Sequence, residues 1–120
     1  MRALAFIPSL AVITLIWATD LPETLGAHPW WSEKSVLIGA PVGLALAWGA
    51  GLWIAALPRL VIFATFTACA AAAAFFGKRA FVASFGDSTL AGQFWYFGWI
   101  GVMAGVAALA MTLSAIALRR

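Results

Sequence analysis

The chain has 120 residues, of which 65% are hydrophobic and only 9% are charged, with a formal net charge of +3. An ordinary soluble domain is about 45–50% apolar and about 25% charged, so a soluble fold of this size could not cover so much apolar surface. The seven basic residues are scattered without forming a basic stripe, which argues against a nucleic-acid partner and favours the lipid bilayer.

Four stretches of the chain contain no Asp, Glu, Lys, Arg or His: residues 3–19, 35–57, 60–76 and 94–118. Helices of these lengths are about 25 to 38 Å long, which suits a hydrocarbon core about 30 Å thick. Strands are a poor alternative because alanine dominates and no period-two alternation occurs. We therefore predict an all-α integral membrane protein in which residues 1–120 form a single domain, an up-down bundle of four transmembrane helices.

The first stretch, 3–19, follows Arg2 and resembles the start of a signal peptide. No A-x-A-like cleavage site precedes Asp20, because the stretch ends in Ile16-Trp17-Ala18-Thr19. We therefore predict an uncleaved first span with Trp17 as an interfacial anchor at its far end.

The first connection, residues 20–34, is the most polar part of the chain. Trp30 and Trp31 are predicted to anchor it among the lipid headgroups. His28 is a candidate ligand for a pigment or haem held by a partner, although an exposed interfacial histidine is the simpler interpretation. The neighbouring acids match no metal signature, so no metal site is predicted.

Small residues form ridges in two of the stretches. Such residues let helices approach closely in lipid, where no hydrophobic force drives helices together. We expect these ridges to serve packing within the bundle or docking on a partner. They consist of Gly39, Gly43, Ala47 and Gly51 in the second stretch and Gly101 and Gly105 in the fourth.

Only Pro58-Arg59 separates the second stretch from the third. One helix over residues 35–76 would be about 63 Å long, roughly twice the hydrocarbon thickness, so the chain must turn back. Pro58 is the natural place for the turn. The second and third spans are therefore predicted to be antiparallel neighbours, and Cys69 in the third is predicted to be a small buried hydrophobe.

The third connection, residues 78–93, contains several apolar residues and is therefore predicted to lie along the membrane surface. These residues are Phe81, Val82, Phe85 and Leu90. Its segment Asp87-Ser88-Thr89 is typical of a helix N-cap that leads into the fourth span. The aromatic residues at the start of that span are predicted interfacial anchors: Trp95, Tyr96 and Trp99.

The charges predict an orientation. Four spans put both termini and the second connection on one side, which has four basic residues and no acid: Arg2, Arg59, Arg119 and Arg120. The other side has Lys34, Lys78 and Arg79 together with every acid. Basic residues mark the cytoplasmic side. We predict N-in, C-in topology in a bacterial inner membrane, with the acidic loops outside.

The four stretches lack the residues that several membrane functions require. Proton-coupled exporters need an embedded carboxylate, haem anchors need two embedded histidines, and thiol enzymes need paired cysteines. The polar groups that remain are hydroxyls, which we expect to bond to their own helices. They belong to Ser9, Thr14, Thr65, Thr67, Thr112 and Ser114.

Three classes of function remain. The favoured one is a non-catalytic accessory or assembly subunit that packs against a larger membrane-protein complex. The alternative is a small transporter or channel that acts as a homo-oligomer. The third is a membrane-embedded enzyme that uses Asp20, Glu23, His28 or Asp87 as acid or base. The favoured class predicts no catalytic residue, and no cofactor is identified.

Overall fold

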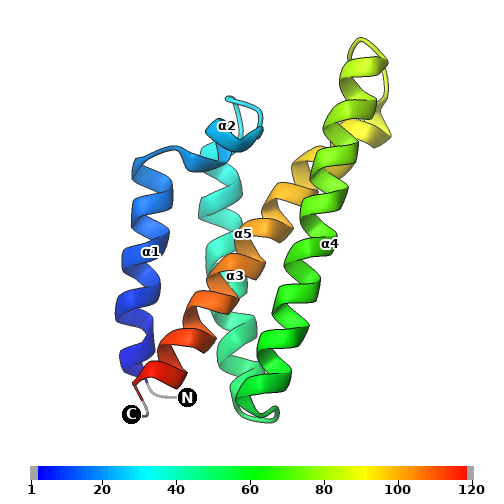
Figure 1. Cartoon of the computed structure of the whole chain (residues 1–120). Helices are drawn as coiled ribbons and strands as arrows, with labels where there is room; N and C mark the ends of the chain where they lie inside the picture. Colours follow the sequence, from blue (N-terminus) through cyan, green and yellow to red (C-terminus); the bar gives the residue numbers. More distant parts are fainter. Residues whose placement is uncertain (1–2, 119–120) are drawn as a thin grey trace.

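The computed structural model describes residues 3–118, and every regular element in that range is helical (Figure 1). Three helices are long and apolar enough to cross a membrane, and residues Ala3–Ala18 form a shorter apolar helix. The all-helical class is confirmed, and the three long apolar helices are those expected of a membrane protein. In chain order the elements are η1 (Ala3–Ala5), α1 (Phe6–Ala18), α2 (Leu21–Leu25), α3 (Ser32–Gly51), α4 (Ala56–Ala83) and α5 (Thr89–Ala117).

Helix α5 is the central element of the structure. It packs along α4 on one side and along α3 on the other, and α1 touches both α5 and α3 (Figure 1). Helices α3 and α4 touch each other only slightly. The prediction that these two helices pack as antiparallel neighbours is therefore wrong, because α5 separates them over most of their lengths.

Two seams of small residues explain the central place of α5. In the α3–α5 seam, Gly39 and Gly43 lie against the α5 backbone at Ile100 and Ala104. With small residues on two faces, α5 can approach both neighbours closely, and close approach stabilises helix pairs in lipid. In the α4–α5 seam, Gly98 lies against Ala74, Gly101 against Ala70 and Gly105 against Thr67.

The turn between α3 and α4 occupies residues 52–55, so the prediction of a turn at Pro58-Arg59 is wrong. Pro58 lies in the first turn of α4. The missing N–H is harmless there, because first-turn N–H groups have no partner within a helix. Arg59 follows in the same turn, and its side chain is buried, with 2% of its surface exposed.

Helix α4 continues well past the predicted end of the third span and reaches Ala83. The connection to α5 is therefore residues 84–88, and the predicted surface loop over 78–93 is wrong. The charges at 78 and 79 end the uncharged stretch, but Lys and Arg are good helix formers and do not end the helix.

The α4–α5 turn is closed by two end motifs. The Phe85 N–H donates to the Val82 carbonyl and the Gly86 N–H donates to the Phe81 carbonyl, each at 3.0 Å, in a Schellman motif. Phe85 occupies the left-handed position, with φ of 56°. The Ser88 hydroxyl then accepts from the backbone N–H three residues later at 3.2 Å, which confirms the predicted N-cap.

Four of the six hydroxyls predicted to bond to their own helices do so, whereas the hydroxyls of Thr65 and Ser114 make no hydrogen bond within residues 3–118. The bonded hydroxyls are satisfied by local backbone. The donors are Ser9, Thr14, Thr67 and Thr112, each bonded to the carbonyl four residues earlier at 2.7–2.8 Å.

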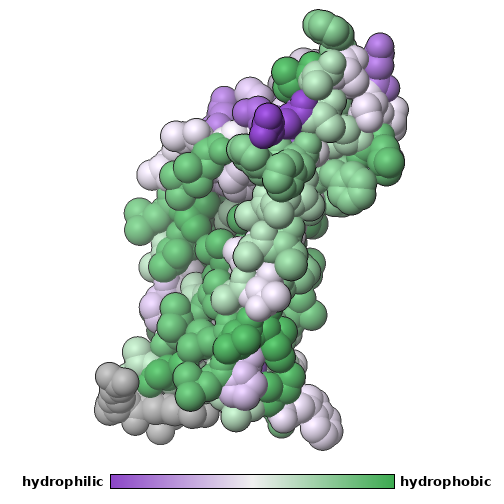
Figure 2. Space-filling view, turned by 45° about the vertical axis from the view of Figure 1, so that its right-hand side comes forward, coloured by the Kyte–Doolittle hydropathy of each residue, from purple (hydrophilic) through white to green (hydrophobic). Residues whose placement is uncertain are grey.

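Hydrophilic side chains gather toward the end of the molecule that carries α2, above a broad hydrophobic surface (Figure 2). We call this the α2 end. On α4, the uncharged residues 60–77 span about 27 Å between Arg59 and Lys78, close to the hydrocarbon thickness. The other basic residues predicted to share a side with Arg59 lie outside the described residues: Arg2, Arg119 and Arg120.

Candidate functional site

Most of the small residues predicted for packing or docking lie inside the chain. Gly39 and Gly43 fill the α3–α5 seam, Gly101 and Gly105 fill the α4–α5 seam, Ala47 is buried in the core, and Gly51 is half-buried at the end of α3. The four seam glycines are covered by a neighbouring helix of the same chain. A surface that receives a partner must therefore be formed mainly by other residues.

An aromatic cluster at the α2 end surrounds Trp95. This side chain is 7% exposed, and its indole N–H donates to the Gly26 carbonyl at 3.0 Å. The rings of Trp31, His28 and Phe81 lie around it, with centroids 5.3, 5.5 and 5.6 Å away. Trp95 thus lies within the protein and ties the first loop to the α4–α5 hairpin.

The other predicted anchors are more open. Trp17 and Trp30 have 46% and 86% of their surfaces exposed. Tyr96 packs edge-on against Trp31, with centroids 5.1 Å apart, and Trp99 lines a groove described below.

His28 is half-buried at the edge of the aromatic cluster. Its Nδ1 accepts a hydrogen bond from the Trp30 backbone N–H at 3.1 Å, and its ring lies edge-on to Trp30 and Trp95. Across residues 3–118, no three His, Cys, Asp or Glu side chains lie together as a metal site would require. These contacts give His28 a packing role in the first loop.

The acids of the first loop connect α1 to α3. Ser32 Oγ donates to Asp20 Oδ1 and Trp17 Nε1 donates to Glu33 Oε1, each at 3.1 Å. Glu23 lies beside Asp20, and the hydrogen bond and negative charge of that neighbour raise the pKa of Glu23 above its ordinary value.

We expect Asp20→Asn to lower the pKa of Glu23, because the substitution removes the negative charge and supplies an amide donor to the ionised carboxylate. Asparagine also tolerates the left-handed backbone at this position, where φ is 54°. Carboxyl-carbon NMR titration in detergent micelles measures the shift. The matched control, Asp87→Asn in the α4–α5 turn, should leave the pKa of Glu23 unchanged. An unchanged value in Asp20→Asn contradicts the assignment.

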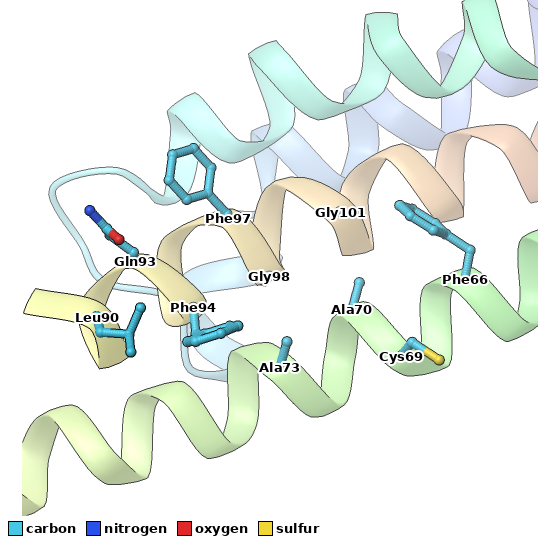
Figure 3. A pocket seen from close by; sticks show the side chains of 10 residues that line it. All are labelled: Phe66, Cys69, Ala70, Ala73, Leu90, Gln93, Phe94, Phe97, Gly98 and Gly101. Carbon is cyan, nitrogen blue, oxygen red and sulfur yellow. The ribbon is translucent and has the colours of Figure 1, made fainter.

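A groove of about 460 Å³ lies along one side of the α4–α5 seam. We call it the cysteine groove. Phe66 extends from α4 toward α5, while Leu90 and Phe94 extend from α5 toward α4 (Figure 3). Its lining residues are Phe66, Cys69, Ala70, Ala73, Leu90, Gln93, Phe94, Phe97, Gly98 and Gly101.

Polar character in the cysteine groove is confined to Gln93 and Cys69. The side-chain amide of Gln93 makes no hydrogen bond to any other residue within 3–118. Cys69 is exposed, so its predicted burial is wrong. Only one face of α4 meets α5, and Cys69 lies at the edge of that face. The same helix carries an exposed line of small residues outside the groove lining: Ala64, Ala68 and Ala72.

A second groove, of about 800 Å³, lies on the other side of the α4–α5 seam. We call it the cationic groove because Lys78 and Arg79 line it. Helix α4 supplies most of its wall, α5 supplies Trp99 and Val102, and the first loop closes one edge. Its remaining lining residues are Leu25, Gly26, Ala71, Ala74, Phe75, Val82 and Ala83.

The cationic groove was missed from the sequence because residues 78–93 were predicted to be a loop. A signal was present, since Ala71, Phe75, Lys78 and Val82 recur at the three- and four-residue spacing of one helical face. That face exists only if α4 continues through the charges. Comparisons with known protein families, curated proteins and solved structures find no match to this chain.

Proposed function

We propose that this protein is a non-catalytic subunit that docks through the cysteine groove against a larger membrane-protein complex. The observation that carries the proposal is the exposed small-residue surface of α4. Ala64, Ala68 and Ala72 recur at four-residue spacing along this exposed surface. In lipid, such a surface permits the close approach on which helix association depends.

The internal seams strengthen this argument. Gly98, Gly101 and Gly105 are already occupied by α4, so the small residues of α5 have a function within the chain. Ala64, Ala68 and Ala72 on α4 are exposed instead, so no helix within residues 3–118 covers them. The cysteine groove offers a place for side chains of an approaching helix, and the Gln93 side-chain amide offers a hydrogen bond that strengthens contact between helices in lipid.

The proposed topology has four spans, with the shorter helix Ala3–Ala18 as the first. At about 24 Å it is shorter than the hydrocarbon core, which a membrane accommodates by local thinning. An even number of spans puts both termini on one side. The acids all lie toward the α2 end, and the basic termini favour the cytoplasmic side of a bacterial inner membrane.

The single cysteine makes a direct test possible without engineering. A photoreactive maleimide probe attached to Cys69 in native membranes should crosslink to a different polypeptide, identified by mass spectrometry. The matched control carries Cys69→Ala and Ala11→Cys, which moves the probe to an exposed site on α1. This control should lose the crosslinked product.

Two other outcomes contradict the proposal. Labelling of lipid alone, with the product remaining near the 12.7 kDa of the chain, shows that no protein lies against the groove. A product of twice that mass, made of two identical chains, favours the homo-oligomeric transporter instead. As a second measurement, Cys69→Phe should lower recovery of the complex in mild detergent about tenfold, whereas Ala11→Phe should not.

A further inference from the structure

Lys78 and Arg79 lie at the cationic groove, each beside an aromatic ring. Lys78 Nζ lies 5.8 Å from the centroid of a Trp95 ring, and the Arg79 guanidinium carbon lies 5.7 Å from that of Phe75. Within residues 3–118, neither side chain forms an ion pair with a carboxylate. Aromatic faces orient a cation without cancelling its charge, so the groove keeps two positive charges.

The length of α4 places the two cations where lipid headgroups are expected. The uncharged run of α4 below them is about as long as the hydrocarbon core is thick. The aromatic cluster around Trp95 lies at the same end, and aromatic side chains favour the interface. An anion that meets Lys78 and Arg79 would therefore sit at the membrane boundary.

Below the cations, the wall of the groove is apolar. Ala71, Ala74 and Phe75 line it from α4, and Trp99 and Val102 line it from α5. Its volume, about 800 Å³, lies in the range of sites that enclose most of a small amphipathic ligand, about 300–1,000 Å³. The groove thus presents two cations above a hydrophobic channel, which is complementary to a phosphate joined to a hydrocarbon chain.

We propose that the cationic groove binds one anionic glycerophospholipid. Lys78 and Arg79 bind the phosphate, the first as a point charge and the second through its guanidinium fork. One acyl chain lies along Ala71 and Phe75 toward the middle of the membrane. Basic pockets between membrane helices select anionic headgroups in this way. The proposal is independent of docking through the cysteine groove, because the two grooves lie on opposite sides of the α4–α5 seam.

Native mass spectrometry of the whole chain in mild detergent tests the proposal. Phosphatidylglycerol and phosphatidylcholine with identical acyl chains are added at equal concentrations. We expect one phosphatidylglycerol per chain, bound at least about tenfold more tightly than phosphatidylcholine. Glycerol phosphate, which has no acyl chains, should not compete with phosphatidylglycerol at the same concentration. The reason is that the apolar wall of the groove contributes to binding through its contact with an acyl chain.

Three variants make the test specific. Lys78→Gln with Arg79→Gln should abolish the preference for phosphatidylglycerol, and Lys34→Gln, at the same end but outside the groove, should preserve it. Ala71→Phe should weaken the binding of both lipids, because it fills the apolar channel while leaving the two positive charges in place. Equal binding of the two lipids by the native chain would overturn the proposal. So would a loss of the phosphatidylglycerol preference in Lys34→Gln as large as that in the Lys78→Gln, Arg79→Gln variant.

Discussion

Replacing Gly43 with leucine should destabilise the folded protein by about 3 kcal/mol or more. A Cβ atom at this position would overlap the backbone of Ala104, which cannot move without displacing α5. Overpacking is mild where a flexible side chain can give way, but here the obstacle is main chain on a second helix. Since α5 is also packed along α4, separating it from α3 strains both seams.

The matched control is Gly49→Leu on the same helix, because a Cβ there would meet nothing within 4 Å. We expect that variant to be neutral or stabilising by up to about 1 kcal/mol, since glycine is a poor helix former. Unfolding by SDS in mixed micelles, followed by tryptophan fluorescence, compares the two. Equal stability of both variants would show that α3 and α5 do not meet at Gly43.

The helices could be predicted from the sequence better than their ends. Absence of charge marks the part of a helix that crosses hydrocarbon, and this locates α4 and α5 correctly. It says little about where a helix stops. Helix α4 continues through Lys78 and Arg79 and stops at Ala83, just before the turn at Phe85 that backbone hydrogen bonds close. At the other end, Pro58 resembles a helix breaker but occupies a first turn that tolerates it.

The pairing of the helices was harder to predict than their existence. Small residues occur on three helices, so several pairings satisfy the same pattern. The structure selects α5 as the common partner because its small residues occupy two faces, with Ala104 toward α3 and Gly101 toward α4. The sequence contains both faces, but a ridge on one helix does not identify the helix that covers it.

The same limit applies to the aromatic residues at the α2 end. A tryptophan near a membrane boundary is predicted to face headgroups, and Trp30 is indeed exposed. Trp95 also lies near a predicted membrane boundary in the sequence, but it is buried because the first loop folds over it. The long-range contacts of Trp95 distinguish the two roles, among them the hydrogen bond to Gly26, 69 positions away.

Replacing Trp95 with alanine should therefore destabilise the protein by about 3–5 kcal/mol, the usual cost of removing a buried large aromatic side chain. The loss includes ring contacts with Trp31, His28 and Phe81, which come from the first loop and α4. Trp95→Phe keeps a ring but removes the N–H donated to the Gly26 carbonyl. We expect it to cost about 1 kcal/mol, the net value of one hydrogen bond.

The control is Trp53→Ala, since Trp53 is 89% exposed at the opposite end of the molecule. It removes the same side-chain volume without removing packing within the chain, so its effect should remain below about 0.5 kcal/mol. Near-UV circular dichroism adds a second readout, because loss of Trp95 should release the first loop and reduce the signal of the remaining aromatic cluster. If Trp95→Ala and Trp53→Ala are equally stable, Trp95 is a lipid-facing anchor, and the first loop is not attached to the hairpin through it.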